Sequence, residues 1–330
     1  MGKPTRSAAE QNELYTTYAQ EYLAHKLINQ SFTNAPLFDK LLNRGRDVGG
    51  AVEIVIPVMD NYTSVGGWIT RGTTVNVTHV DPFTNSRWTW AFRYEPAYLD
   101  WTDEQQTEGD GAELRYIEES LDNCMGRHYE GMATDLCAAS TATNGYNSLV
   151  ALIDSTGSIG NLNPATTGQS FWAAYETNSI GSFSANGVDE LRRAFRTTSK
   201  YKGLGKVDII ACSKVAYDEY EKSGLALTTR TTNVGDGRAD LGISELAYKG
   251  VPVIYEPHMD ALESSLNGVM LGINSQHCKI VKKPGDAMKF SGWVDMLPGN
   301  KLGRAGTIKG AYQVVLYARA PHFKLTGITS

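Results

Sequence analysis

The feature that most constrains the fold is a stretch without proline from Ala112 to Ala139. Its apolar positions advance by three or four residues, as the side chains on one face of a helix do: Leu114, Ile117, Leu121, Cys124, Met125, His128, Met132 and Leu136. This spacing predicts one amphipathic helix of about 28 residues, roughly 42 Å long. Gly126 and Gly131 interrupt it, each costing up to about 1 kcal/mol relative to alanine. Because a small globule is narrower than 42 Å, we expect an elongated or plate-like protein.

A β-rich region precedes this helix. Val52–Val58 is rich in valine and isoleucine and predicts a strand. Thr74–Val80 and Arg87–Tyr94 alternate apolar and polar residues around the turn-forming Asp81–Ser86, which predicts a hairpin with arms of about 25 Å. The region is rich in aromatic side chains: Trp68, Trp88, Trp90, Phe92 and Tyr94. A lone hairpin is marginally stable in water, so these rings need a surface, either the parent core or a neighbouring copy.

The remaining chain reads as an N-terminal arm (residues 1–50, helical over 8–28) and a later α/β region. Helices are predicted at Val188–Ser199 and Lys214–Ser223. Continuous apolar runs predict buried strands of a parallel type at Val207–Cys212, Val251–Glu256 and Val269–Ile273, and a strand-like run at Ser148–Ile153. Further strands are expected at Lys279–Lys283, Met288–Met296 and Thr307–Ala318.

Charge is segregated along the chain. The whole sequence carries 31 basic and 36 acidic residues, a net charge of −5, which disfavours a sequence-specific reader of duplex DNA. Residues 101–140 hold ten acids and two bases, a local net of −8, whereas residues 271–330 hold nine bases and two acids, a local net of +7. Two interpretations remain open: differently solvated faces of one molecule, or complementary surfaces that meet between copies.

Recognisable catalytic and cofactor motifs are absent from the sequence. The four cysteines (124, 137, 212 and 278) form no CxxC pair, and the six histidines show no HExxH or HxxxH spacing. Gly299–Gly306 is glycine-rich but lacks the ending of a phosphate-binding loop. We therefore expect no enzyme activity, cofactor or metal. No run of 18 apolar residues occurs, so we expect no membrane partner.

The order of these parts resembles that of the major capsid proteins of tailed bacteriophages. Local matches lie mainly in the second half: the strand-then-helix pattern of Val207–Tyr220, the YKGVPV run within Leu246–Pro257, the strand region Gly268–Lys283, and Gln169–Ser179 before the Val188 helix. These are structural patterns rather than catalytic signatures. The resemblance implies an α+β phage major capsid fold with an N-arm, an extended β-hairpin E-loop, a P-domain with a long spine helix, and an α/β A-domain.

On this resemblance the chain divides as 1–50 N-terminal arm, 51–100 P-domain strand and E-loop, 101–144 spine helix, 145–275 A-domain and 276–330 strands returning to the P-domain. In this family the E-loop lies across a neighbouring subunit. That implies intersubunit contacts from Trp68, Arg71, Arg87, Trp88, Trp90 and Arg93. It also implies an acidic helix surface at Glu113, Glu118, Glu119 and Asp122, with basic partners at Lys282, Lys283, Lys301, Arg304 and Lys309.

The function implied is an icosahedral head shell built of pentamers and hexamers around double-stranded DNA, which it contacts non-specifically. A separate scaffolding protein, a portal and a decoration protein are the expected partners, with assembly in the host bacterial cytoplasm and a final location in the virion. Residues 60–100 contain no lysine, which excludes the covalent lysine–asparagine bond that some family members make from this loop. The alternatives are an encapsulin-type compartment with the same fold and, less favoured, a soluble α/β enzyme.

Overall fold

The computed structural model describes residues 33–49, 52–59, 68–74, 83–102, 110–201, 203–228, 246–285, 287–296 and 303–329. The helix expected over 8–28 and nearly all of the strand expected over 74–80 lie outside these residues. The chain forms two compact units. Unit 1 comprises Met1–Thr33, Phe92–Met132 and Gly285–Ala311, and unit 2 comprises Asn34–Ala91, Ala133–Pro284 and Tyr312–Ser330.

The main sheet of unit 2 has the order β5-β15-β10-β7-β9-β8, with β6 also paired to β15. Its strands are β5 (Tyr175–Thr177), β6 (Gly181–Ser182), β7 (Ile209–Cys212), β8 (Ala247–Tyr248), β9 (Val251–Tyr255), β10 (Gly268–Ile273) and β15 (Phe323–Thr329). β7 and β9 are parallel, as expected, but β10 runs antiparallel to both β7 and β15. The sheet is therefore mixed rather than parallel throughout. An apolar run indicates that both faces of a strand are buried, but it does not indicate the direction of the strand.

The placement of β15 corrects the expected return of all residues from 276 to 330 to the long-helix domain. β15 pairs with β10 in register Leu271↔Lys324 and Gly272↔Phe323, and its Phe323, Leu325 and Ile328 join the core of unit 2. Their burial supplies the driving force for this pairing, since each fully buried large apolar side chain contributes about 1.5–3 kcal/mol.

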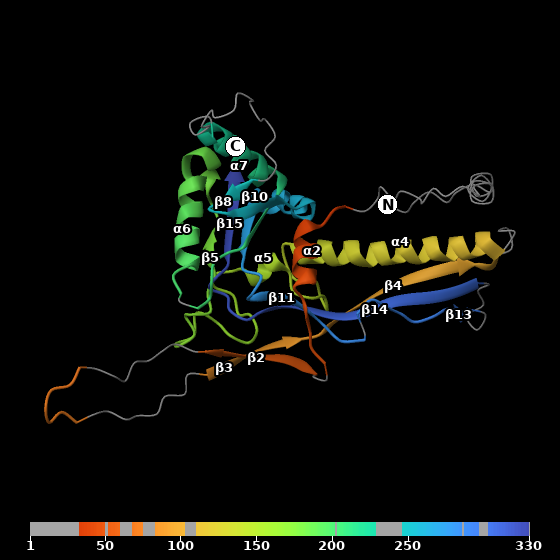
Figure 1. The fold of residues 1–330 in the computed structure, drawn as a ribbon, viewed down its shortest axis with the longest axis horizontal. Helices are drawn as coiled ribbons and strands as arrows, with labels where there is room; N and C mark the ends of the chain where they lie inside the picture. Colours follow the sequence, from red (N-terminus) through yellow and green to blue (C-terminus); the bar gives the residue numbers. More distant parts are fainter. Residues whose placement is uncertain are drawn as a thin grey trace, which may run out of the picture. The chain divides into compact units, whose positions relative to one another are not determined.

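Helices flank this sheet in unit 2. α6 (Val188–Thr198), preceded by a π-turn at Phe183–Gly187, and α7 (Lys214–Thr228) pack beside its strands (Figure 1). Both confirm the helices expected there, and α8 (Glu263–Leu266) follows a 3₁₀ turn at Pro257–Leu262. Ser148–Ile153, expected as a strand, is instead the short helix α5 (Leu149–Leu152), because Ser148 Oγ accepts the Val150 N–H and caps it.

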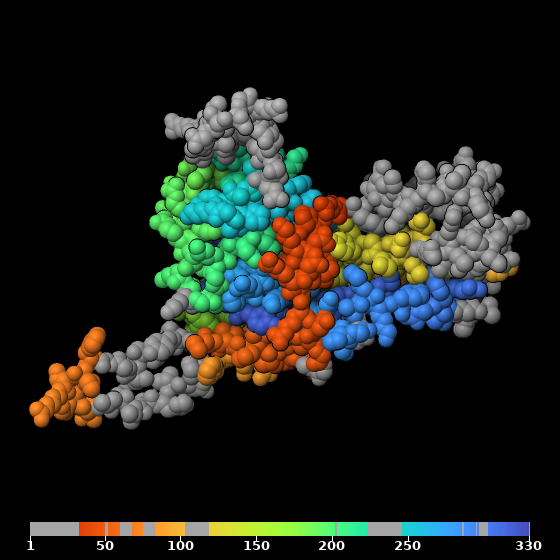
Figure 2. Space-filling model, viewed as in Figure 1, coloured from red at the N-terminus to blue at the C-terminus, as the bar shows by residue number. Residues whose placement is uncertain are grey.

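Helix α2 (Pro36–Asn43) lies on the surface of unit 2 (Figure 2) and is fastened at both ends. At its start, the Leu37 N–H donates to Oε2 of buried Glu256 at 2.8 Å. Just after its end, Arg44 pairs with Asp208 at 2.5 Å. Leu37, Phe38 and Leu41 are buried beneath it. The short β1 (Arg46–Asp47) then runs parallel to β11 (Cys278–Lys282).

The two strands β2 (Glu53–Met59) and β3 (Phe83–Thr89) form an antiparallel ribbon in unit 2, in register Glu53↔Thr89 to Met59↔Phe83. The strand expected over Arg87–Tyr94 is wrong in its extent. β3 ends at Thr89, and β4 (Ala91–Asp100) begins a separate pairing with β14 (Gly303–Leu316). The expected turn at Asp81–Ser86 is also too long, because Phe83–Ser86 belong to β3. Alternation continues across such a break, so the pattern alone did not reveal it.

Unit 1 is built on the long helix. α4 (Asp110–Cys137) confirms the 28-residue element, and its last residues belong to unit 2. In unit 1, β4 and the short β12 (Lys289–Phe290) and β13 (Val294–Asp295) pair with the first half of β14. Cys124 of α4 packs with Ala97 and Ile308 of this sheet. Among the described residues, no helix is both long and apolar enough to cross a membrane.

The β10–β15 pairing can be tested at Gly272. A Cβ at this position would overlap the ring of Phe323. We expect Gly272→Ala to cost about 1–3 kcal/mol by overpacking and to lower the melting temperature by several degrees in calorimetry. Gly49→Ala is the control, since its Cβ would meet Pro284 at an ordinary 3.5 Å. Equal shifts for the two variants would contradict the packing described.

Candidate functional site

The β2–β3 ribbon has one buried and one exposed face. Ile54, Ile56, Ser86 and Trp88 are buried, and Trp88 Nε1 donates to Ser86 Oγ at 3.1 Å. On the other face, Val55, Met59 and Phe83 remain largely exposed, with an ion pair of 3.7 Å between Arg87 and Glu53. The strands thus bury one apolar face within a single copy and leave the other uncovered.

The buried face of β3 rests on the loop that follows α5. The Arg87 N–H donates to the Gly160 carbonyl at 2.9 Å. Gly160 has φ +61°, and a Cβ there would lie 2.9 Å from the Trp88 ring, so glycine is required both by its backbone and by the ring above it. Beside this contact, a cavity of about 390 Å³ is lined by residues of β3, of α5 and the segments before and after it, and by Gln313.

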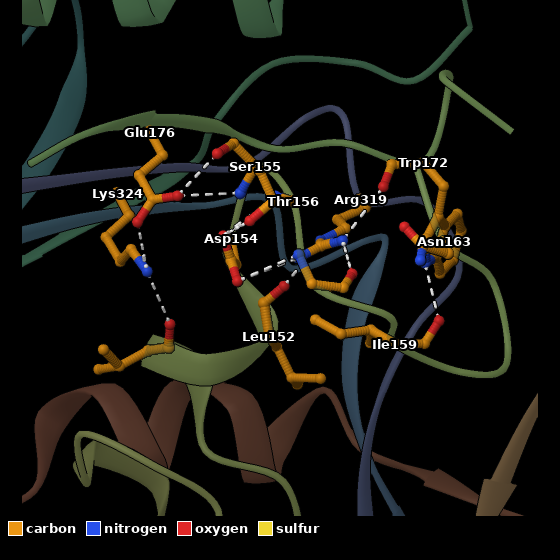
Figure 3. Close-up of polar contacts among 12 residues, drawn as sticks. Leu152, Asp154, Ser155, Thr156, Ile159, Asn163, Trp172, Glu176, Arg319 and Lys324 are labelled. Atoms are coloured by element: carbon orange, nitrogen blue, oxygen red, sulfur yellow. Dashed lines mark hydrogen bonds and ion pairs between the residues drawn. The ribbon is translucent and has the colours of Figure 1, made fainter. Parts of the chain in front are cut away.

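A cluster of buried charges holds the same loop (Figure 3). Arg319, which lies between β14 and β15, is fully buried. Its Nε donates to the Leu152 carbonyl at 3.1 Å, and its Nη1 donates to the carbonyls of Gly157 at 2.8 Å and Trp172 at 3.2 Å. Asp154 lies 4.0 Å from Nη2. Burial lowers the pKa of Arg319 to about 10, although Asp154 and Glu176 act to raise it, so the guanidinium stays charged at neutral pH.

A second buried cation completes the cluster. Lys324 of β15 pairs with Glu176 of β5 at 2.8 Å and donates to the Val150 carbonyl at 3.2 Å. Glu176 also accepts from the backbone and hydroxyl of Ser155. Burial acts to raise the pKa of Asp154, but the Thr156 N–H, Glu176, Lys324 and Arg319 together lower it to about 2. Each buried charge therefore has an opposite charge or carbonyl dipoles, which is what makes its burial tolerable.

Unit 1 carries an exposed aromatic stripe on β4. Its exposed face carries Phe92, Tyr94 and Tyr98, exposed by 73%, 71% and 45%, with Pro96 between the last two. A hollow of about 260 Å³ opens beside it, lined by Phe92, Arg93, Tyr94, Lys309, Gly310 and Ala311. Several large exposed rings in a row exceed the scattered apolar residues of an ordinary surface and mark a candidate interaction site.

The residues expected at an intersubunit contact differ in their surroundings. Trp68 and Arg71 are exposed around a tight turn in which the Thr73 N–H donates to the Thr70 carbonyl, and Arg87 is largely exposed. Trp90 is half-buried, whereas the Trp88 ring is buried by its own chain. This burial revises the expectation for Trp88, because its ring already has a surface to cover it.

Arg93 lies against the long helix. A Cβ at Gly131 would meet the terminal Nη2 of Arg93, so the guanidinium passes close over this position of α4. Burial, and then the charge of Arg93, lower the pKa of His128 on the same helix to about 4, so this histidine is neutral at pH 7. The apolar stripe through Cys124, His128 and Met132 is buried as the periodicity indicates.

The charged residues expected to meet across subunits are only partly described. Glu119 is half-buried and Asp122 exposed on α4, whereas the side chains of Glu113 and Glu118 lie outside the description. Arg304 and Lys309 of β14 are exposed and Lys283 is half-buried, while Lys301 lies outside the described residues. Lys282 lies 3.9 Å from Asp47 of its own chain. The pairing of these acids and bases between copies stays a prediction.

Sequence reasoning missed Arg319, Lys324 and Gly160. Nothing in the sequence distinguishes Arg319 from a surface base, because its partners are backbone carbonyls about 150–170 residues away. The only available signal was the excess of bases over acids in residues 271–330, two of which are these buried cations.

The described residues show no grouping of three or more side chains suited to hold a metal ion. The four cysteines are buried and unpaired with one another. Burial raises the pKa of each thiol, to about 12 for Cys278. The candidate functional features among the described residues are therefore the exposed apolar surfaces and the buried charge cluster.

The comparisons with known proteins agree on the architecture. No protein-family model and no curated protein matches the sequence. Among solved structures, the capsid of cyanophage A-1(L) matches with a TM-score of 0.63 and 13% identity, covering 96% of this chain and 99% of that one. The chain has the phage major capsid fold. The mature capsid of bacteriophage PhiM1 matches at 0.55 and 13%, covering 92% of this chain and 90% of that one.

An encapsulin complex from Synechococcus elongatus matches as well, with a TM-score of 0.54 and 12% identity, covering 99% of this chain and 97% of that one. The expected α+β capsid fold is thus confirmed, and the three structures are shell proteins rather than enzymes. Because phage capsids and an encapsulin share it, the fold does not distinguish the two.

A pH dependence follows from His322, beside the cluster. It is fully buried, and its Nδ1 accepts the Asn274 N–H at 3.1 Å. Burial, and then nearby His277, lower the pKa of His322 to about 3. The unfolded chain takes up this proton near pH 6.5, so the free energy of unfolding should fall as pH drops from 6.5 towards 3. His322→Gln keeps an acceptor but does not titrate, and should flatten this slope in denaturant titrations at pH 4–7. An unchanged slope would contradict the assignment.

Proposed function

We propose that the chain is a major capsid protein whose copies assemble into the icosahedral head of a tailed phage around double-stranded DNA. The observation that carries the proposal is the near-complete mutual coverage, 96% and 99%, with the cyanophage A-1(L) capsid. Coverage of this kind shows that the two chains share the fold over almost their whole lengths. A net charge of −5 fits a container wall that touches DNA only weakly, because tight binding of phosphates needs a basic face.

Two exposed apolar surfaces support assembly through copies of the same chain. One is the turn carrying Trp68 and Ile69, and the other is the β4 stripe of Phe92, Tyr94 and Tyr98. We propose that the segment between β2 and β3 reaches a neighbouring copy and that Trp68 and Arg71 contribute to that contact. Exposed charges such as Asp122, Arg304 and Lys309 supply weak, reversible contacts, which let misplaced subunits dissociate.

The partners follow from this role. In this proposal, pentamers and hexamers of the chain form the closed shell. Its further partners are a separate scaffolding protein, a portal and a decoration protein. Assembly takes place in the host bacterial cytoplasm. The encapsulin match supports a second candidate, a compartment for protein cargo. The contents of purified particles separate the two, since nucleic acid indicates a phage head and an enzyme cargo indicates an encapsulin.

Electron microscopy tests the shell role directly. The chain is expressed alone and together with the proteins encoded beside it, and particles are examined in negative stain. Closed shells are the expected result. Folded chain that forms only small discrete oligomers under both conditions would contradict the proposal.

Trp68 and Trp88 should separate assembly from folding. Trp68→Ala removes an exposed ring, so we expect a melting temperature within the small range of surface substitutions but a reduced yield of shells. Trp88→Ala empties a buried site and should cost about 3–5 kcal/mol of stability in the single chain. Tyr201→Ala, at another exposed ring, is the matched control. Normal shell yield from Trp68→Ala would remove Trp68 from the proposed contact.

A further inference from the structure

The guanidinium of buried Arg319 makes its hydrogen bonds to one loop that is distant in sequence, and not to the neighbouring strands β14 and β15. A charge in a protein interior must find hydrogen-bond partners or cost several kcal/mol. Arg319 finds three of them on the carbonyls of Leu152, Gly157 and Trp172. Leu152 begins a single loop and Trp172 ends it (Figure 3), and Gly157 lies five residues after its start. One side chain thereby draws together residues that are up to 20 positions apart.

The loop is also closed on itself. Trp172 Nε1 donates to the Ile159 carbonyl at 3.0 Å. Ile159 and Leu162 exchange backbone hydrogen bonds of 3.0 and 3.1 Å across a tight turn, in which Gly160 and Asn161 both have positive φ. The position of the Gly160 carbonyl is therefore set by Trp172 and, through Gly157 and Trp172, by Arg319.

Gly160 is where this loop meets the β2–β3 ribbon. Its carbonyl accepts the Arg87 N–H at 2.9 Å, and its Cα side faces the Trp88 ring and Ser86. Ser86 in turn lies opposite Ile56 of β2 and donates to its carbonyl at 3.3 Å. Contacts thus run without a gap from Arg319 through the loop to both strands of the ribbon.

We infer that Arg319 is a positioning residue for the β2–β3 ribbon, acting through the loop from Leu152 to Trp172 and its contact at Gly160. β2 and β3 are the two ends of the segment proposed to reach a neighbouring copy. The consequence for assembly rests on the proposed function, whereas the positioning itself is a property of the single chain. Arg319 thus influences the proposed contact with a neighbouring copy without being part of that contact.

Hydrogen exchange measured by mass spectrometry on the unassembled chain tests this. Arg319→Lys keeps a positive charge, but an ammonium cannot reproduce the planar fork that reaches three carbonyls. We expect exchange in residues 53–59 and 83–89 to become at least about tenfold faster, while β7 and β10 exchange as in the parent. Lys324→Gln is the matched control. It removes the other buried cation, which contacts Val150 and Glu176 and reaches the loop only through Glu176 at Ser155, so exchange in 83–89 should change much less than in Arg319→Lys.

Gly160→Ala tests the link from the other side. Its Cβ would press on the Trp88 ring while the contacts of Arg319 stay intact, and the same ribbon peptides should exchange faster. Because both substitutions break one chain of contacts, the double variant should exceed the larger single effect by little. This second variant keeps the inference testable if Arg319→Lys does not fold.

Two outcomes would overturn the inference. Unchanged ribbon exchange in Gly160→Ala, or in folded Arg319→Lys, would show that the loop does not position the ribbon. Equal acceleration in β7, β10 and the ribbon would show that Arg319 supports the whole unit instead. Shell yield is measured separately. Faster ribbon exchange in a chain whose parent never forms shells would sink the proposed function and leave the positioning role intact.

Discussion

The pairing of β15 with β10 is the interaction on which unit 2 depends. β15 lies between β10 on one side and β5 and β6 on the other, so one seven-residue strand joins both parts of the sheet. The register of β15 also determines where the buried charged side chains lie. Lys324 is placed opposite Leu271 and reaches Glu176, and the turn that leads into β15 carries Arg319 and His322. A shift by one residue would turn Phe323 and Leu325 out of the core and bring their neighbours in.

These buried charges change the meaning of the charge pattern. The excess of bases over acids in residues 271–330 includes Arg319 and Lys324, which are neutralised inside their own unit by Asp154, Glu176 and backbone carbonyls. The charge left for contacts with other copies is smaller than the sequence indicates and lies at residues such as Arg304 and Lys309. In the proposed shell, modest surface charges and separate apolar patches fit many contacts that are individually weak.

The elements predictable from the sequence were those with a strong local period or a long apolar run. α4 followed from helical spacing over 28 residues, and β7, β9 and β10 from uninterrupted apolar stretches. α5 was misassigned because four apolar residues carry no period, and the deciding contact is the Ser148 cap. The strand β15 and the role of Arg319 were not predicted, because the partners of both are distant in sequence. For the same reason, Trp88 was predicted as a contact residue although its ring faces Gly160 of its own chain.

The four buried thiols have a consequence for the chemistry of a crowded assembly. Thiol–disulfide exchange proceeds through the thiolate, and burial keeps Cys124, Cys137, Cys212 and Cys278 protonated at neutral pH. Copies of the chain held side by side at very high local concentration would therefore not cross-link at random through sulfur when exposed to oxidants. In the proposed shell, the thiols therefore add no covalent link between copies, and the association of copies depends on the other contacts that they make.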